Sequence, residues 1–245
     1  MNYHRVLATT RRVLLQLRHD PRTVALMVVV PCLLMAMLRY IYDGQPKVFE
    51  RVGPMLLAVF PFVVMFVITS VAMLRERTNG TLELLLTKPL SKGELLAGYA
   101  LAFGAAAIVQ VAAAAALTLG VLGLAIHGSA VVLVIMAVAD AQLGMALGLF
   151  LSAFANSEFQ AVQFLPAFVL PQLLLSGLFA PRDQMATILR WLSDALPISY
   201  AVDGATRAAS SPGFSESLVV DLVVVVACVP LALGLGAVTL RRRTP

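Results

Sequence analysis

Long apolar runs make up most of the chain, and short polar stretches separate them. A helix that crosses a bilayer needs about 20 consecutive, mostly apolar residues. Backbone groups in lipid must find their hydrogen bonds within the segment, and no strand-like alternation is present, so each run predicts a helix. Six runs are long enough: Thr23–Tyr42, Val52–Leu74, Leu95–Ile126, Ser129–Phe154, Phe159–Pro181 and Ser217–Leu240. The pattern predicts an all-α membrane protein whose six transmembrane helices form one domain over residues 23–245.

Residues 1–22 have a different pattern, in which apolar and basic side chains recur with helical spacing. On a helical wheel, the apolar residues of this segment gather within an arc of roughly 120°. They are Tyr3, Val6, Leu7, Val13, Leu14 and Leu17, and the remaining arc holds Arg5, Arg11, Arg12, Arg18 and His19. This is typical of an amphipathic helix in the membrane interface, with its basic face toward the lipid headgroups. A helix that packs on a partner protein is the alternative.

Composition and charge agree with a membrane protein and give its direction. Of the 245 residues, 60% are hydrophobic and 13% charged, against about 25% charged residues in soluble domains. The net charge is +5, but the basic residues gather in residues 1–22, 75–94 and 241–243, at the ends of the spans. This favours membrane topology over a nucleic-acid partner. The positive-inside rule predicts that both termini and the link after the second span are cytoplasmic.

That link is polar and strongly patterned, and it reads LRERTNGTLELLLTKPLSKGE from Leu74 to Glu94. Asn79-Gly80 is a turn signal, and residues 81–86 read as a short helix that Pro89 ends. Ser91-Lys92-Gly93-Glu94 is a capping box at the start of the third span. The link therefore predicts a short cytoplasmic helix over about residues 79–87, held by tight turns to two spans. A solvated charged loop is the alternative.

Candidate chemistry is sparse. The chain has no Gly-rich phosphate loop of the GxxxxGK[ST] kind, and its three histidines have no carboxylate or cysteine cluster around them, so neither a catalytic group nor a metal site is expected. Asp140 lies within the fourth span, where it is either a polar point on a substrate path or a residue that fixes helix packing. Gln142 beside it favours a shared polar patch. Gly144-x-x-x-Gly148 permits close approach of another helix.

The charged link resembles the signature of the ABC-2 type permeases, the membrane subunits of ATP-driven exporters. In that family, E-R-x-x-G-T-L-E-x-L-L-x-x-P follows the second span and forms the coupling helix. The matching residues are Glu76, Arg77, Gly80, Thr81, Leu82, Glu83, Leu85, Leu86 and Pro89. A second similar region, Leu170–Arg207, resembles the family's fifth span with its extracytoplasmic hairpin and a P-x-x-Y-x-x-[DE] element, here Pro197, Tyr200 and Asp203. The chain looks closest to the daunorubicin-resistance and nodulation-export branch.

The resemblance implies a permease subunit in a bacterial plasma membrane, with no cofactor of its own. Two copies of a separate ATP-binding subunit would bind ATP and magnesium, and a second permease subunit, identical or homologous, would complete the pathway. The N-terminal helix and the coupling helix would form the docking surface for the ATPase. A small hydrophobic or amphipathic substrate (drug, antibiotic or lipid-like) would pass between the halves, along Met55, Phe60, Phe62, Met65, Phe66, Asp140, Phe164 and Phe168.

The sequence leaves three alternatives open. The aromatic and methionine residues of the predicted path are also ordinary packing or lipid-facing side chains. The chain is alternatively an ATP-independent secondary transporter with Asp140 as its proton site, or a membrane assembly or immunity protein that transports nothing.

Overall fold

The computed structural model describes residues 2–79, 90–213 and 215–239, and these ranges contain helices and loops but no strand. Six helical segments are long and apolar enough to cross a membrane. They are α2 (Pro21–Ile41), α3 (Pro46–Thr78), α5 (Lys92–Ala115) with a π-helical extension (Ala116–Val121), α6 (Ala130–Leu151) with a 3-10 turn (Ser152–Phe154), α7 (Glu158–Phe164) continued through a π-helical turn (Leu165–Val169) into α8 (Leu170–Leu175), and α11 (Glu216–Thr239). The prediction of an all-α protein with six spans is confirmed.

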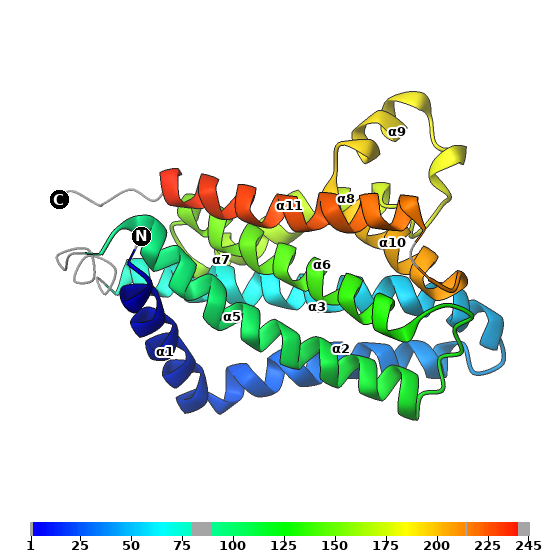
Figure 1. The fold of residues 1–245 in the computed structure, drawn as a ribbon, viewed down its shortest axis with the longest axis horizontal. Coiled ribbons are helices and arrows are strands. Elements are labelled where there is room, and N and C mark those ends of the chain that lie inside the picture. Colours follow the sequence, from blue (N-terminus) through cyan, green and yellow to red (C-terminus); the bar gives the residue numbers. More distant parts are fainter. Residues whose placement is uncertain (1, 80–89, 214, 240–245) are drawn as a thin grey trace.

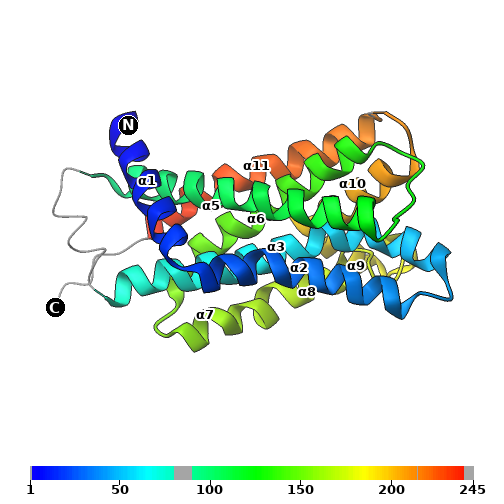
Figure 2. The same ribbon diagram turned by 90° about the horizontal axis from the view of Figure 1, so that it is seen from below.

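Helices outside the six spans mark the two ends of the bundle. The amphipathic N-terminal segment is α1 (Tyr3–His19), which lies at the end where α3 finishes and α5 begins. A 3-10 turn (Arg182–Gln184), α9 (Thr187–Asp194) and α10 (Pro197–Ser210) lie at the opposite end (Figure 1). We call these the α1 end and the α9 end. Successive spans run in alternating directions between them, as Figure 2 shows from a second side.

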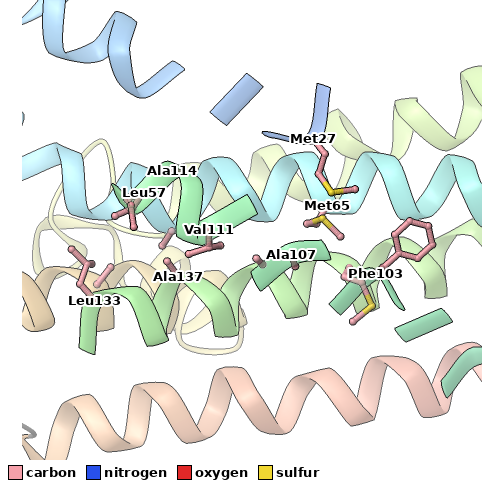
Figure 3. Packing of buried hydrophobic residues seen from close by; sticks show 14 of the residues in the cluster. Met27, Leu57, Met65, Phe103, Ala107, Val111, Ala114, Leu133 and Ala137 are labelled. Carbon is pink, nitrogen blue, oxygen red and sulfur yellow. The ribbon is translucent and has the colours of Figure 1, made fainter. Parts of the chain in front are cut away.

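The core lies where α3 and α5 pack against α6. Buried side chains from four helices meet there, and Figure 3 shows Met27 of α2, Met65 of α3, Phe103 of α5 and Leu133 of α6 among them. The most extensive packing between two helices is that of α3 on α6. A Cβ atom at Gly144 or at Gly148 would overlap the backbone carbonyl of α3, so both glycines are needed for this approach. The close packing predicted from Gly144-x-x-x-Gly148 is confirmed.

The helices depart from the predicted apolar runs where local chemistry differs. α3 begins at Pro46, six residues before its apolar run, because proline suits the first position of a helix. α8 ends at Leu175, well before Pro181, and Gly177 follows with a φ of +91° that favours glycine. Pro166 lies within the fifth span, and the backbone there forms a π-helical turn at Leu165–Val169. π-helical turns accommodate such interruptions of the α-helical hydrogen bonds.

Backbone hydrogen bonds tie two distant connections together at the α9 end. The amides of His127 and Gly128 donate to the Ala209 carbonyl at 2.9 and 2.8 Å, and the Ser129 amide donates to Ala208 at 3.0 Å. The loop between α5 and α6 therefore rests on the last turn of α10. A Cβ atom at Gly128 would overlap the Ala208 carbonyl, so glycine is required at this position.

Candidate functional site

At the α1 end, α1 packs along the first turns of α5. A Cβ atom at Gly98 would overlap Thr9, so the glycine allows the two helices to approach closely. Thr10 donates a hydrogen bond to the Gly98 carbonyl at 3.2 Å. Val6 and Val13 of α1 are also buried. One edge of the apolar arc predicted for α1 thus packs inside the chain, and the exposed remainder comprises Tyr3, Leu7 and Leu14.

Glu94 holds the starts of α5 and α1 together. Ser91 and Glu94 form the predicted capping box: the Ser91 hydroxyl accepts the Glu94 amide at 3.1 Å, and the Glu94 carboxylate accepts the Ser91 amide at 2.9 Å. The same carboxylate accepts the Asn2 amide at 2.6 Å, and Arg5 lies 3.8 Å from it. One buried acid therefore satisfies amides at the N-termini of two helices.

Glu76, the first residue of the predicted coupling signature, connects α3 with α1 and, through Arg12, with α5. Its Oε1 accepts a hydrogen bond from Gln16 at 3.2 Å and lies 3.4 Å from Nη2 of Arg12. Arg12 donates to the Tyr99 hydroxyl, and its guanidinium lies 5.6 Å from the centre of that ring. The placement of Arg12 on a headgroup-facing side was therefore wrong. The carboxylate and the ring turn it inward through charge-assisted and cation–π contacts.

The two arginines beside Glu76 connect α3 to the end of the fourth span and to the start of the fifth. Arg77 donates to the backbone carbonyls of Ser152 and Ala155 at 2.5 and 3.4 Å, where α6 has ended. Arg75 forms a bidentate pair with Glu158 at 2.7 and 3.1 Å. Glu76 and Arg77 thus have partners within this chain, and their contact with an ATPase stays a prediction.

The other predicted coupling residues lie outside the described part of the chain, which stops at Asn79 and resumes at Leu90. The short helix expected over residues 79–87 falls almost entirely in this gap. The two helices that flank the gap, α3 and α5, are placed, and both contact α1. The residues concerned are Gly80, Thr81, Leu82, Glu83, Leu85, Leu86 and Pro89.

Most residues of the predicted substrate path are buried within this single chain. Phe62 and Phe66 are fully buried, and their backbone carbonyls lie against Gly144 and Gly148 of α6. Met65 is fully buried in the core (Figure 3). Packing of α3 on α6 accounts for this burial, which the apolar pattern alone does not specify. The remaining residues, Met55, Phe60, Phe164 and Phe168, range from buried to nearly half exposed, and the path itself stays a prediction.

Asp140 is completely buried in α6, and neither carboxylate oxygen has a hydrogen-bond partner among the described residues. One turn further along α6, Gly144 meets the backbone of Phe62 in α3. Gln142 faces another helix, because its amide donates to the Gly104 carbonyl of α5 at 3.0 Å. The two polar side chains therefore do not form the shared patch that their spacing suggested.

At the α9 end, the Pro197-Tyr200-Asp203 element holds the segment before it. Pro197 opens α10, and the Tyr200 hydroxyl donates to the backbone carbonyl of Asp194 at 2.7 Å. The Asp203 carboxylate pairs with Arg182 at 2.5 Å, and Arg182 also pairs with Asp194. Tyr200 and Asp203 lie on the same side of α10, three residues apart, and fix α9 and the turn before it to this helix.

Sequence reasoning missed the rest of this ionic network. Arg207 lies 4.0 Å from Asp203, one turn earlier on α10, and pairs with Asp221 of α11. The spacing of Asp203 and Arg207 by four residues was a usable signal, since such pairs are neighbours on a helix. The pairs that Arg182 and Asp221 form depend on tertiary packing and had no local signal. The network links the segment before α9 to the last span.

The fold and the two ends define a polytopic α-helical membrane protein with helical structure at both ends of its six spans. Comparison with known proteins identifies the family, because the sequence model of the ABC-2 type transporter family matches residues 4–208. The chain belongs to the ABC-2 type transporter family, a group of membrane transport proteins.

Relatives with assigned names agree with this membership at low identity. The probable multidrug ABC transporter permeases YbhS and YbhR of Escherichia coli K12 are 25% and 28% identical over 178 and 152 residues, which cover 72% and 62% of this chain. ABC transporter G family member 20 of Dictyostelium discoideum is 26% identical over 160 residues, or 64% of the chain. The matched regions make up 47%, 41% and 22% of these relatives, so the chain spans less than half of their length.

Proposed function

We propose that this chain is the permease subunit of an ATP-driven exporter. It would form half of a translocation pathway and receive the work of ATP hydrolysis from a separate subunit. The family match over residues 4–208 carries this proposal. The partner would be two copies of an ATP-binding subunit that hold ATP and magnesium, together with a second permease subunit of the same or a homologous sequence.

The proposed direction in the membrane follows from charge. Basic residues gather in residues 1–22, 75–94 and 241–243, and the first two of these segments flank the α1 end. Under the positive-inside rule this end is cytoplasmic, with both chain termini on that side of a bacterial plasma membrane. The α9 end is then extracytoplasmic, and the ATPase docks at the α1 end.

Coupling would use the contacts around Glu76. A partner that moves residues 80–89 displaces the last turn of α3, where Glu76 contacts Gln16 and Arg12 of α1. Arg12 in turn donates a hydrogen bond to the hydroxyl of Tyr99 in α5. Because ion pairs and packed helices connect three elements here, a displacement of one is shared by all three. ATP-driven closure of the partner would therefore rock the halves of the permease.

The exported molecule would be hydrophobic or amphipathic, as for a drug, an antibiotic or a lipid. Two relatives bear names as probable multidrug permeases. The predicted path contains aromatic and methionine side chains, which adapt to several apolar shapes. Of these, Phe168 is 48% exposed on this chain and so has surface available to a second permease subunit or to a substrate.

Charge reversal in the coupling segment tests the proposal. The tagged chain is co-expressed with a candidate ATP-binding subunit from the same source, and co-purification and ATP hydrolysis are measured for the wild type, Glu83→Arg and Gly80→Pro. We expect both variants to lose at least about tenfold in co-purified ATPase or in stimulated hydrolysis, because like charges or a broken turn at a docking site cost affinity. Arg51→Glu, an exposed reversal at the α9 end, is the control and retains both. Wild-type assembly and hydrolysis in Glu83→Arg and Gly80→Pro would refute the coupling role.

A further inference from the structure

A cavity of about 400 Å³ lies between α1, α2, α3 and α5 at the α1 end. This volume falls within the range of small-molecule sites. Its walls are mainly apolar and include Leu17, Val67, Ile68, Val71 and Phe103. Exposed polar residues also line it, so the cavity reaches the protein surface; these are Gln16, Arg75 and Asn79. It is separate from the predicted substrate path, whose residues do not line it.

Two carboxylates, Asp20 and Glu76, line this apolar space. Glu76 shares its charge with Arg12, which lies 3.4 Å away, but its second oxygen, Oε2, is buried and makes no hydrogen bond to a described residue. Asp20 accepts hydrogen bonds from the Thr23 amide and hydroxyl at 3.2 and 2.6 Å. These bonds lower the pKa of Asp20, so it is ionised at neutral pH.

Two carboxylates and one guanidinium line the cavity, so its lining side chains carry one excess negative charge. Arg75 is neutralised by its bidentate pair with Glu158, and Glu76 is balanced by Arg12. Asp20 has no ion-pair partner within 4 Å among the described residues, and Arg75, whose charge lowers the pKa of Asp20, acts on it from a greater distance. Arg18 and Arg22 flank it in sequence but do not line the cavity. An apolar cavity with one excess negative charge complements an apolar molecule with one positive charge.

We propose that this cavity binds an amphipathic organic cation, with the charged group beside Asp20 and Glu76 and the apolar body against α3 and α5. The site rests on the proposed export function and names the class of molecule that the permease would collect at its α1 end. A bound cation competes with Arg12 for Glu76, so binding also loosens the contact between α1 and α3. Binding of a cation in the cavity would therefore change the contacts of Glu76, which belongs to the proposed coupling residues.

Binding of two ions with one shape tests this proposal on the full chain in lipid nanodiscs, without the ATPase. Tetraphenylphosphonium and tetraphenylborate have similar shapes and opposite charges, and their binding to the protein is measured by equilibrium dialysis as the difference from empty nanodiscs, because the bilayer itself takes up both ions. We expect the phosphonium ion to bind at least about tenfold more tightly than the borate ion, since only the cation gains from the two carboxylates. Comparable affinity of the two ions would overturn the assignment of a cation site.

Substitutions locate the site. Asp20→Asn keeps an N-cap residue, and Glu76→Gln keeps an oxygen for Gln16, so both variants should fold. Each is expected to weaken phosphonium binding about tenfold, because a charged contact is lost. Val71→Trp fills the cavity and should do the same. The control is Glu50→Gln, which removes an acid from the opposite end of α3 and leaves binding unchanged.

Wild-type phosphonium affinity in Asp20→Asn and Glu76→Gln would refute the site even if Val71→Trp weakened binding, because an apolar pocket alone would then explain the result. Failure here is distinct from failure of the proposed function. A chain that assembles with its ATPase and hydrolyses ATP on stimulation, yet binds both ions equally, loses only the cation site. A chain that binds phosphonium through Asp20 but recruits no ATPase keeps the site and loses the coupling.

Discussion

At the residue scale, Asp140 and Gln142 show how position on one helix decides the energetic role of a polar side chain. They lie two residues apart on α6 and therefore face different neighbours. Gln142 donates to the Gly104 carbonyl of α5, whereas the Asp140 oxygens are buried without a hydrogen bond to any described residue. A buried polar group without a partner costs free energy, and a bonded one repays part of that cost. The two residues should respond oppositely to the same substitution.

Replacement of each by leucine measures this difference. Asp140→Leu removes an unpaired buried group of similar size, so we expect the thermal unfolding midpoint in detergent to rise by roughly 2–6 °C. Gln142→Leu deletes the hydrogen bond to α5 and should lower the midpoint by a similar amount. Scanning fluorimetry of the two purified variants decides the matter. A lower midpoint for Asp140→Leu would show that the carboxyl makes a stabilising contact in the folded protein.

At the element scale, the glycines of α6 set how closely α3 can approach. A side chain at Gly144 would overlap the carbonyl of Phe62, which belongs to the backbone and has little room to move. Gly234 of α11 has no atom within 4 Å of the equivalent position. An added methyl group therefore overlaps the backbone of α3 at Gly144 and meets no protein atom at Gly234.

Alanine at these two positions should separate packing from helix propensity. Gly144→Ala forces α3 and α6 apart and is expected to cost about 1–3 kcal/mol or more, seen as a lower unfolding midpoint or as loss of the monodisperse peak in size-exclusion chromatography. Gly234→Ala gains helix propensity of up to about 1 kcal/mol and should leave the midpoint equal or higher. A stable Gly144→Ala variant would contradict the close contact between α3 and α6.

The same scale shows which features the sequence could predict. The six spans and the Ser91–Glu94 capping box depend on neighbours within one helix, and both were predicted correctly. The bond from Asn2 to Glu94 joins residues 92 positions apart, and only the packing of α1 on α5 brings them together. The inward turn of Arg12 and the ion pairs of Arg182 have the same origin. Local pattern thus predicts elements, whereas tertiary packing decides which polar side chains meet.

At the scale of the whole molecule, five of the six spans lie between α1 and α9, so these two helices lie on opposite sides of the membrane (Figures 1 and 2). Arg11 on α1 and Ile188 on α9 are both exposed. Each is therefore a suitable position for a label that cannot cross the membrane. The native cysteines, Cys32 and Cys228, are half-buried and are replaced first to give a clean background.

Single cysteines at these positions test the proposed orientation. With an impermeant maleimide on intact cells, we expect Ile188→Cys to be labelled several-fold more strongly than Arg11→Cys, because the positive-inside rule places α1 in the cytoplasm. Both should react equally after the cells are permeabilised, which controls for accessibility. Preferential labelling of Arg11→Cys in intact cells would reverse the orientation.

The loop between α5 and α6 has a consequence for engineering the protein. Its amides at His127, Gly128 and Ser129 are hydrogen-bonded to the end of α10. An inserted epitope or fluorescent domain would therefore disturb both this loop and the end of α10. The turn between α2 and α3 has no such restraint at Gly44, which is exposed and has no atom within 4 Å of the place that a Cβ atom would take. Both loops lie on the same side of the molecule. An insertion in the α5–α6 loop would break its hydrogen bonds to α10, so the α2–α3 turn at Gly44 is the better place for an inserted tag.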